Sequence, residues 1–440
     1  MGNLDRSPSG RVVLPTAACS EWGDHIGPHL VDAMTHAGAP TPAEIVDRLS
    51  GLWEVLDELV ERAGTGRLQP WGVRWAGAWQ LVATSAAGPG VAAPVWASAR
   101  AAGWRSDLHT VLAVLVRALA GRWPISEQDA MRLVRICAGE LPLGIDSICA
   151  ELCDPTGAPG TTADLRELTD LLAVRCGAVG ARAYVETAVG SRKAAGRPGG
   201  DNEDAAGWTL TTAGDLNLAV LDGVTGPGDG SGRRAARVAL AAAAAMWHQH
   251  ADVPPETVLS AAHAAVVTEA APAAAVAIFG RVSPDGAASL AGVGDASAWL
   301  LRRRGDSSYV SVRLTPEQTS QARLYRADPL AWSEDSVVEC TLGGDIVGAF
   351  RVGFAVVPGD LIVVVTDGAA VDEIGREDFP AALVRLARER VAAGAPMGPS
   401  LAAAITGRAE SLGGWDNATA LVVDVARLAT ATGTDPDLGG

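Results

Sequence analysis

The sequence has few of the features that mark secreted, membrane-spanning or nucleic-acid-binding proteins. Its six cysteines, spread over 440 residues without short paired spacings, fit a reducing cytoplasm better than a disulfide framework. No uncharged apolar run reaches the roughly 18 residues of a membrane span, since Arg117 interrupts one candidate and His263 and Glu269 interrupt another. The net charge of −16 disfavours a nucleic-acid or anionic-membrane surface, because clustered Lys and Arg residues bind such phosphates.

The overall composition favours a folded cytoplasmic protein of two domains. Residues 1–11 are polar and Gly-rich, without the apolar core of a signal peptide, so we expect a cytoplasmic location. The preference for Ala, Gly, Arg and Val over Lys and Asn is typical of a high-GC bacterium. A chain of 440 residues exceeds one ordinary core, and 48% hydrophobic residues supply enough material for two.

The spacing of apolar residues changes near residue 181. Before this point they recur at intervals of three and four, as in Leu108, Leu112 and Leu115, which predicts a mostly helical domain over residues 1–180. After it, short strands predominate up to residue 428. The Thr-, Asp- and Gly-rich tail, residues 429–440, is predicted to be disordered.

Residues 181–428 alternate pairs of helices with runs of strands. The predicted helices cover residues 233–250, 255–270, 379–393 and 400–411. The predicted strands cover residues 183–189, 209–212, 216–221, 273–282, 287–293, 298–303, 309–314, 336–341, 350–356, 361–366 and 420–425. This order indicates sheets that pack together and carry helices on both outer sides.

Five acidic residues of this domain lie where an apolar strand ends or begins: Glu203, Asp222, Asp295, Asp367 and Asp416. Hard divalent cations bind carboxylate and carbonyl oxygens, and carboxylates gathered at one sheet edge repel one another unless cations neutralise them. The pattern therefore predicts a magnesium or manganese site, and with it metal-assisted phosphate chemistry.

Six short motifs carry these acids in a fixed order. They are Asp201-Asn202-Glu203-Asp204, Asp222-Gly223, Gly294-Asp295, Thr315-Pro316-Glu317, Asp367-Gly368 and Trp415-Asp416-Asn417. A single Asp-Gly is a common turn, but the ordered set, over about residues 183–426, resembles the PP2C (PPM) family of metal-dependent serine/threonine phosphatases. The resemblance implies an α+β fold, the PP2C-like αββα sandwich of two antiparallel sheets covered by helices, preceded here by the mostly α-helical domain.

The resemblance also implies a role for each matching residue. Asp222 would bridge two Mn²⁺ or Mg²⁺ ions, and the carbonyl of Gly223 would ligate one of them. The other ion would be held by Asp367 and Asp416. Metal-coordinated waters would be bound by Glu203 and Asp204, and Asp295 matches the position of a third, weaker metal in many members. Two such cations lower the pKa of a shared water, which attacks the phosphorus in line.

One position departs from the family pattern. Members usually place a phosphate-binding arginine four residues before the Glu of the Asn-Glu-Asp motif, and this position is Gly199 here. Arg197 is the nearest candidate, and Arg192 and Arg233 are weaker substitutes. Loss of a bidentate phosphate ligand lowers substrate affinity more readily than it abolishes water activation. The departure therefore bears on turnover, not on the fold or on metal binding.

Three patterns in the first domain have a structural and a functional interpretation. Trp71, Trp75 and Trp79 step by four, as on one side of a helix, and core packing is favoured over an exposed stripe that docks a partner. The histidines and aspartate within residues 25–36 favour a solvated helical face over a metal site. The four cysteines within residues 137–176 favour buried core positions over zinc binding.

Taken together, the patterns predict a metal-dependent phosphatase that hydrolyses phosphoserine or phosphothreonine on a protein partner. The N-terminal domain would recruit this partner or regulate the enzyme, and a cognate kinase system would supply the phosphorylated protein. The alternative is a PP2C-fold module with little or no turnover that binds a phosphoprotein or a signalling partner. Neither interpretation involves nucleic acid or a membrane.

Overall fold

The computed structural model describes residues 73–75, 79–81, 127–136, 179–196, 202–224, 231–250, 252–304, 308–327, 337–344, 346, 348–373 and 375–427. Its contacts divide the chain into two units. The first contains residues 1–173 and 324–332, and the second contains residues 174–323 and 333–440. Each unit is described by itself.

In the first unit, two short strands replace the helix that the tryptophan spacing predicts. Strands β1 (Val73–Trp75) and β2 (Trp79–Leu81) pair antiparallel, with Trp75 directly opposite Trp79. The predicted helical stripe is therefore wrong over these residues, because a spacing of four also arises when a short turn brings two strand residues face to face. Trp71 and the predicted histidine and cysteine groups lie outside the described residues.

The other described element of the first unit is helix α6 (Glu127–Ile136). It is amphipathic: Ala130, Leu133 and Val134 are buried, whereas Gln128 is exposed. The prediction of a mostly helical domain over residues 1–180 otherwise falls largely on residues outside the described ranges.

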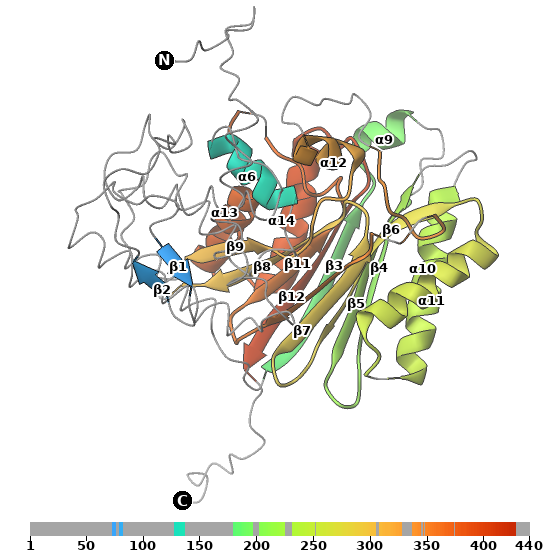
Figure 1. The fold of residues 1–440 in the computed structure, drawn as a ribbon, viewed down its shortest axis with the longest axis horizontal. Helices are drawn as coiled ribbons and strands as arrows, with labels where there is room; N and C mark the ends of the chain where they lie inside the picture. Colours follow the sequence, from blue (N-terminus) through green and yellow to red (C-terminus); the bar gives the residue numbers. More distant parts are fainter. Residues whose placement is uncertain are drawn as a thin grey trace, which may run out of the picture. The chain divides into compact units, whose positions relative to one another are not determined.

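The second unit contains two five-stranded antiparallel sheets (Figure 1). The first sheet has the order β10-β7-β6-β5-β4, with strands β10 (Phe350–Ala355), β7 (Ala287–Val293), β6 (Ala274–Val282), β5 (Leu216–Val224) and β4 (Ala205–Leu210). The second has the order β3-β12-β11-β8-β9, with strands β3 (Val179–Ala188), β12 (Ala418–Arg427), β11 (Leu361–Val365), β8 (Ser297–Arg303) and β9 (Tyr309–Arg313).

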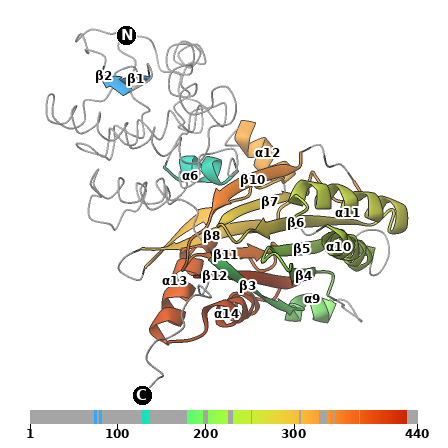
Figure 2. The same ribbon diagram turned by 90° about the horizontal axis from the view of Figure 1, so that it is seen from below.

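Two helices cover the outer face of each sheet (Figure 2). Helices α10 (Ser231–Gln249) and α11 (Pro255–Glu269) pack on the first sheet, and helices α13 (Phe379–Ala392) and α14 (Met397–Ser411) pack on the second. The described part of the second unit thus forms four layers, and the predicted αββα sandwich is confirmed.

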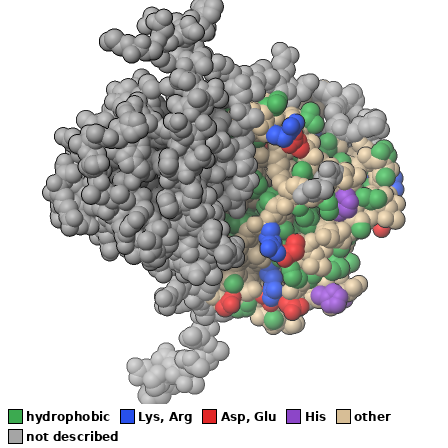
Figure 3. Space-filling model, in the orientation of Figure 1, with side chains coloured by type: hydrophobic (Ala, Val, Ile, Leu, Met, Phe, Trp, Pro, Cys, Tyr) green, Lys and Arg blue, Asp and Glu red, His purple; other side chains and the backbone are tan. Residues whose placement is uncertain are grey.

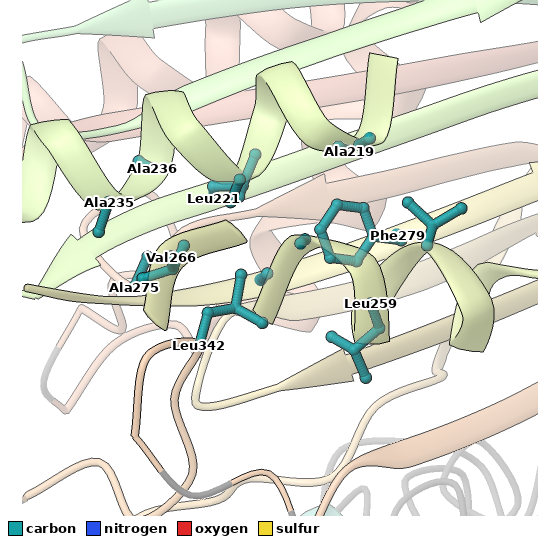
Figure 4. Packing of buried hydrophobic residues seen from close by; sticks show 14 of the residues in the cluster. Ala219, Leu221, Ala235, Ala236, Leu259, Val266, Ala275, Phe279 and Leu342 are labelled. Atoms are coloured by element: carbon teal, nitrogen blue, oxygen red, sulfur yellow. The ribbon is translucent and has the colours of Figure 1, made fainter. Parts of the chain in front are cut away.

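The alternation of side chains along each strand separates the hydrophobic layers. Ala219, Leu221 and Phe279 pack against Leu259 and Val266 of helix α11 and the alanines of α10 (Figure 4). Leu218 and Val220 are equally buried, and as alternate residues of the same strand they project from the opposite face, toward the other sheet. Small alanines on α10 let that helix lie close to the sheet.

Three segments differ from the sequence prediction. A short helix, α9 (Ser191–Gly196), begins shortly after strand β3, between the predicted strands at 183–189 and 209–212. Helix α12 (Ser320–Ala327) was not predicted. The predicted strand at 336–341 is wrong in its described part, where 337–344 makes only two isolated bridges, Thr319↔Val338 and Ala275↔Leu342. Val337 there is 59% exposed, so no buried face holds this segment in a sheet.

The face shown in Figure 3 carries acidic, basic and hydrophobic side chains interspersed over its described surface, without one large patch of a single kind. Among the described residues, no helix combines the length and the apolar character that crossing a bilayer requires.

Candidate metal centre

Strand register brings the predicted acidic residues of the first sheet to one edge. Ala205, at the start of β4, lies opposite Leu221, near the end of β5. Glu203 and Asp204 precede this pair and Asp222 follows it, so the three acids meet where β4 begins and β5 ends. The sequence predicted that strand β5 ends at residue 221, before Asp222. In the structure β5 continues to Val224, so Asp222 lies within the strand.

The acids of the second sheet gather in the same way. Val365, the last residue of β11, lies opposite both Ser297 of β8 and Ala420 of β12. Asp367 follows β11, Asp295 precedes β8 and Asp416 precedes β12. The three acids therefore surround the end of β11.

Hydrogen bonds link these two groups across the sandwich. The hydroxyl of Thr366 donates to Oδ2 of Asp204 over 3.0 Å. The backbone N–H of Glu203 donates to Oδ1 of Asn417 over 3.2 Å. Both bonds join residues more than 150 positions apart in the chain, so the loops of the two sheets form one edge of the sandwich. This edge, with its six carboxylates, is called the carboxylate edge below.

The carboxylates perturb one another strongly. Burial, then the charges of Asp204 and Asp367, raise the pKa of Asp222 well above its ordinary value of 3.8. Burial likewise raises the pKa of Asp367 and that of Asp204, the latter to about 6. Asp222 hydrogen-bonds to both Asp204 and Asp367, so these carboxyl groups share protons that a cation could replace.

Asp295 belongs to the same electrostatic group. Burial, followed by the charge of Asp367, raises its pKa to about 7. The loop that places it turns at Gly294, whose φ of +95° favours glycine. The N–H of Gly294 donates to the side-chain oxygen of Gln318 over 2.8 Å, which ties this turn to the segment that follows β9.

Close backbone packing fixes two glycine positions of the carboxylate edge, one in strand β5 and one after strand β11. A Cβ on Gly223 would lie 2.3 Å from the carbonyl carbon of Gly232, in helix α10. A Cβ on Gly368 would lie 2.0 Å from the carbonyl oxygen of Asn417. Neither position has room for a side chain, so the backbone beside Asp222 and Asp367 requires glycine.

Sequence reasoning missed the cation that the structure places in this cluster, Lys193 of helix α9. Its ammonium nitrogen lies 3.3 Å from Oε2 of Glu203 and also donates a short hydrogen bond to Oδ1 of Asp416. Burial alone would lower the pKa of Lys193, but the bonds to Asp416 and Glu203 raise it above its ordinary value. The Lys193 side chain is only 12% exposed. Its positive charge partly opposes the rise in the pKa of Asp367 that burial causes.

Arg197, the predicted phosphate-binding residue, lies outside the described residues and stays a prediction. The segment Gly190-Ser191-Arg192-Lys193 follows shortly after strand β3, but no local sequence pattern links it to the acidic residues. The end of β3 lies beside the start of β12, where Ala188 is opposite Ala418.

The carboxylate edge offers the donors that a hard divalent cation requires. All its candidate ligands are oxygens, and Oδ1 of Asp204 is buried without a hydrogen-bond partner among the described residues. These residues do not contain a group of three or more His, Cys, Asp or Glu side chains already spaced to ligate an ion. Lys193 pairs with two of the carboxylates, and a cation that binds the deprotonated carboxylates would compete with this ammonium and with protons.

Comparison with known proteins finds similar solved structures but no similar sequence family. No protein-family model matches the chain, and no curated protein matches its sequence. The serine/threonine phosphatase PstP/Ppp of Mycobacterium tuberculosis is similar with a TM-score of 0.43 and 18% identity, covering 56% of this chain and 98% of that one. The PstP catalytic domain in complex with 2 manganese ions is similar with a TM-score of 0.43 and 20% identity. This similarity covers 56% of this chain and 99% of that one.

A third similar structure is the PPM Ser-Thr phosphatase MsPP from Mycobacterium smegmatis in complex with cacodylate. It has a TM-score of 0.40 and 22% identity, and covers 55% of this chain and 97% of that one. At these identities the similarity concerns the fold alone.

Proposed function

We propose that residues 181–428 form a metal-dependent phosphatase that hydrolyses phosphoserine or phosphothreonine on a protein. The observation that carries this proposal is the convergence of six carboxylates from both sheets on one edge, where burial and mutual repulsion raise several of their pKa values. Such a cluster costs stability unless protons or cations neutralise it. No other group of described residues offers comparable chemistry.

The residues suited to hold Mn²⁺ or Mg²⁺ are Asp222, the Gly223 carbonyl, Asp367 and Asp416, with Glu203 and Asp204 for bound water and Asp295 for a further ion. When bound, a pair of such ions supplies a water of lowered pKa and neutralises phosphate charge. The chain itself contributes rigid placement of the carboxylates, through the close backbone packing at Gly223 and Gly368.

Lys193 supplies the positive charge that a phosphate group requires on a chain of net charge −16. Its ammonium donates to Asp416 and Glu203, so it lies among the candidate metal ligands. An ammonium binds phosphate as a point charge and lacks the bidentate geometry of a guanidinium. We therefore expect weaker phosphate binding than an arginine at the same place would give.

The test is hydrolysis of p-nitrophenyl phosphate and of a phosphothreonine peptide by the full chain, with and without Mn²⁺. We expect turnover that requires the metal and falls at least about 100-fold in Asp222→Asn, as for loss of a central electrostatic group. The matched control is Asp424→Asn, at the far end of β12. Burial raises the pKa of Asp424, so its neutral analogue should fold and retain activity. Metal-independent turnover, or equal loss in both variants, contradicts the proposal.

A second function is favoured by one observation, the bond between Lys193 and Asp416. An internal ammonium that already neutralises two candidate ligands would suit a binding module with little turnover. Calorimetry separates the two functions: Mn²⁺ uptake with no hydrolysis of either substrate favours the module, and uptake with hydrolysis favours the enzyme.

The remaining expectations extend the same proposal. Residues 1–180 would recruit the phosphorylated partner or regulate the phosphatase, in the cytoplasm and together with a cognate kinase. Pulldown with the full chain against a deletion of residues 1–180 would test recruitment. Equal capture of the phosphorylated partner by both would contradict it.

A further inference from the structure

Beside the carboxylate edge, an arginine lies flat on an exposed tryptophan. The guanidinium carbon of Arg192 is 3.5 Å from the ring centroid of Trp415. Trp415 is 65% exposed, the largest exposed fraction among the described large hydrophobic residues. It immediately precedes Asp416, and Arg192 immediately precedes Lys193. The pair, called the Arg192–Trp415 platform below, therefore adjoins the candidate metal centre on two sides.

Backbone contacts hold the platform in a fixed position relative to Asp416. The N–H of Arg192 donates to the carbonyl oxygen of Gly414 over 2.9 Å. The N–H of Ser191 donates to Oε2 of Glu410 over 3.1 Å. A Cβ on Gly190 would lie 2.3 Å from the carbonyl oxygen of Asp416, so the two loops touch through their backbones. The arrangement does not depend on flexible side chains alone.

The stacked geometry leaves the hydrogen-bonding edge of the guanidinium available. Stacking uses the flat face of the group, while its N–H donors point outward in the plane. Within the described ranges, no carboxylate forms an ion pair with Arg192, unlike the pairs formed by Arg281, Arg302 and Arg385. A planar, outward guanidinium edge matches a carboxylate, which it binds through two parallel hydrogen bonds.

Arg192 and Lys193 are adjacent in sequence but face different surroundings. Lys193 is 12% exposed and bonds to Glu203 and Asp416 within the cluster, whereas Arg192 is exposed on the ring of Trp415. The cation next to the reaction centre and the cation at its rim are thus separate groups. The inner one suits the phosphate, and the outer one suits a second anionic group of the same ligand.

We propose that the Arg192–Trp415 platform binds an acidic side chain, glutamate or aspartate, of a peptide substrate beside its phosphorylated residue. This inference rests on the proposed function and names its substrate class: phosphopeptides with an acidic flank. The guanidinium binds the carboxylate, and the exposed ring of Trp415 packs against the aliphatic part of the acidic side chain or the neighbouring peptide backbone.

Fluorescence anisotropy with the full chain in Mn²⁺ tests this proposal without requiring turnover. The probes are labelled peptides with a non-hydrolysable phosphonate analogue of phosphothreonine. Each peptide of the series carries one glutamate at a different position before or after the phosphonate residue. Each is paired with a control peptide that has glutamine at the same position. We expect the best glutamate peptide to bind about three- to fivefold more tightly than its glutamine match, as for an exposed charged pair.

The variants assign this preference to the platform. Arg192→Gln should reduce the glutamate-to-glutamine ratio to about one, and Arg192→Lys should restore only part of it, because an ammonium lacks the planar donor edge. Trp415→Ala should lower the ratio because it frees the guanidinium. Arg351→Gln is the matched control, since it removes an exposed arginine that pairs with Glu256 of helix α11. It should keep the full preference.

Three results would overturn the proposal. They are no preference for glutamate in the unmodified chain, no binding of either peptide, or an equal loss of affinity for both peptides in Arg192→Gln. The last result would mean that Arg192 binds the phosphate group itself. Hydrolysis of p-nitrophenyl phosphate, measured in parallel, separates this inference from the proposed function. A preference for glutamate without hydrolysis supports the role of the platform and contradicts the proposed phosphatase activity. Hydrolysis without a preference for glutamate supports the phosphatase activity and contradicts the role of the platform.

Discussion

Without divalent cations, we expect the carboxylate edge to make the fold less stable as the pH rises from about 4 to about 7. Burial raises the pKa of Asp204 to about 6 and that of Asp295 to about 7, from an ordinary value of 3.8. Between these values the folded chain holds protons that the unfolded chain has lost. The stability that these protons contribute is complete only below the pKa of the carboxyl groups in the unfolded chain. It is lost as the pH rises through their pKa in the folded chain.

The magnitude follows from the pKa shifts. At about 1.4 kcal/mol per pKa unit, the shift of Asp295 from 3.8 to about 7 corresponds to about 4 kcal/mol. Solvent at the edge reduces this value, and Asp204, Asp222 and Asp367 share protons, so their shifts do not add. We therefore expect a total loss of about 2–4 kcal/mol across this range, enough to lower Tm by several degrees.

Differential scanning calorimetry in EDTA, from about pH 5 to about pH 7.5, measures this loss. Mn²⁺ should restore the stability at the upper end, because it binds the deprotonated carboxylates. Asp295→Asn should flatten the profile, whereas Asp285→Asn, in the turn between β6 and β7, should leave it steep. A metal-free Tm that is constant or rises over this range would refute the coupling of the carboxylates.

Three further predictions concern groups that hold the site and the sheets. Gly223→Ala should abolish the transition or lower Tm strongly by calorimetry, because its Cβ would lie 2.3 Å from the carbonyl carbon of Gly232. Asp360→Asn should cost about 3–5 kcal/mol in urea unfolding, because it leaves the guanidinium of Arg302, only 1% exposed, without its counter-charge. Lys193→Gln should lower metal-free stability by about 1–2 kcal/mol, and saturating Mn²⁺ should narrow the difference, because the ammonium and the metal neutralise the same carboxylates.

The first two predictions have matched control variants, and the third has its control in the measurement with Mn²⁺. Gly353→Ala, in strand β10, places a Cβ no closer than 4.0 Å to other atoms and should be tolerated. Glu373→Gln breaks an exposed pair with Arg376 and should change stability by less than about 1 kcal/mol. If Lys193→Gln lowers Tm equally with and without Mn²⁺, its role is packing and not charge.

Most strands of the second unit could be predicted because their signals are local. Residues 287–293 are a strand in both prediction and structure, and the ends of helices α10 and α11 agree within about two residues, as expected for helix ends. Where the local pattern was ambiguous, prediction was wrong. The spacing of Trp75 and Trp79 fits a helix and a hairpin equally, and only strand pairing distinguishes them.

The phosphate-binding position illustrates a different limit. Counting back from Glu203 leads to Gly199 and Arg197, but this count crosses a loop whose length no pairing fixes. The structure shows a different cation, Lys193, among the carboxylates, because the segment after strand β3 packs at Gly190 against the backbone of Asp416. Lys193 and Asp416 are 223 positions apart in sequence, so no local pattern connects them.

The sequence by itself determined most strands and the four long helices of the second unit, and that acidic residues lie at or near strand ends. Period and turn chemistry act over a few residues, so they can be read along the chain. Only the tertiary structure decided which strand ends meet, since antiparallel register and sheet packing join residues as distant as Asp204 and Thr366. It also decided which cation lies among the carboxylates and that Arg192 rests on Trp415, because both depend on two loops packing backbone to backbone.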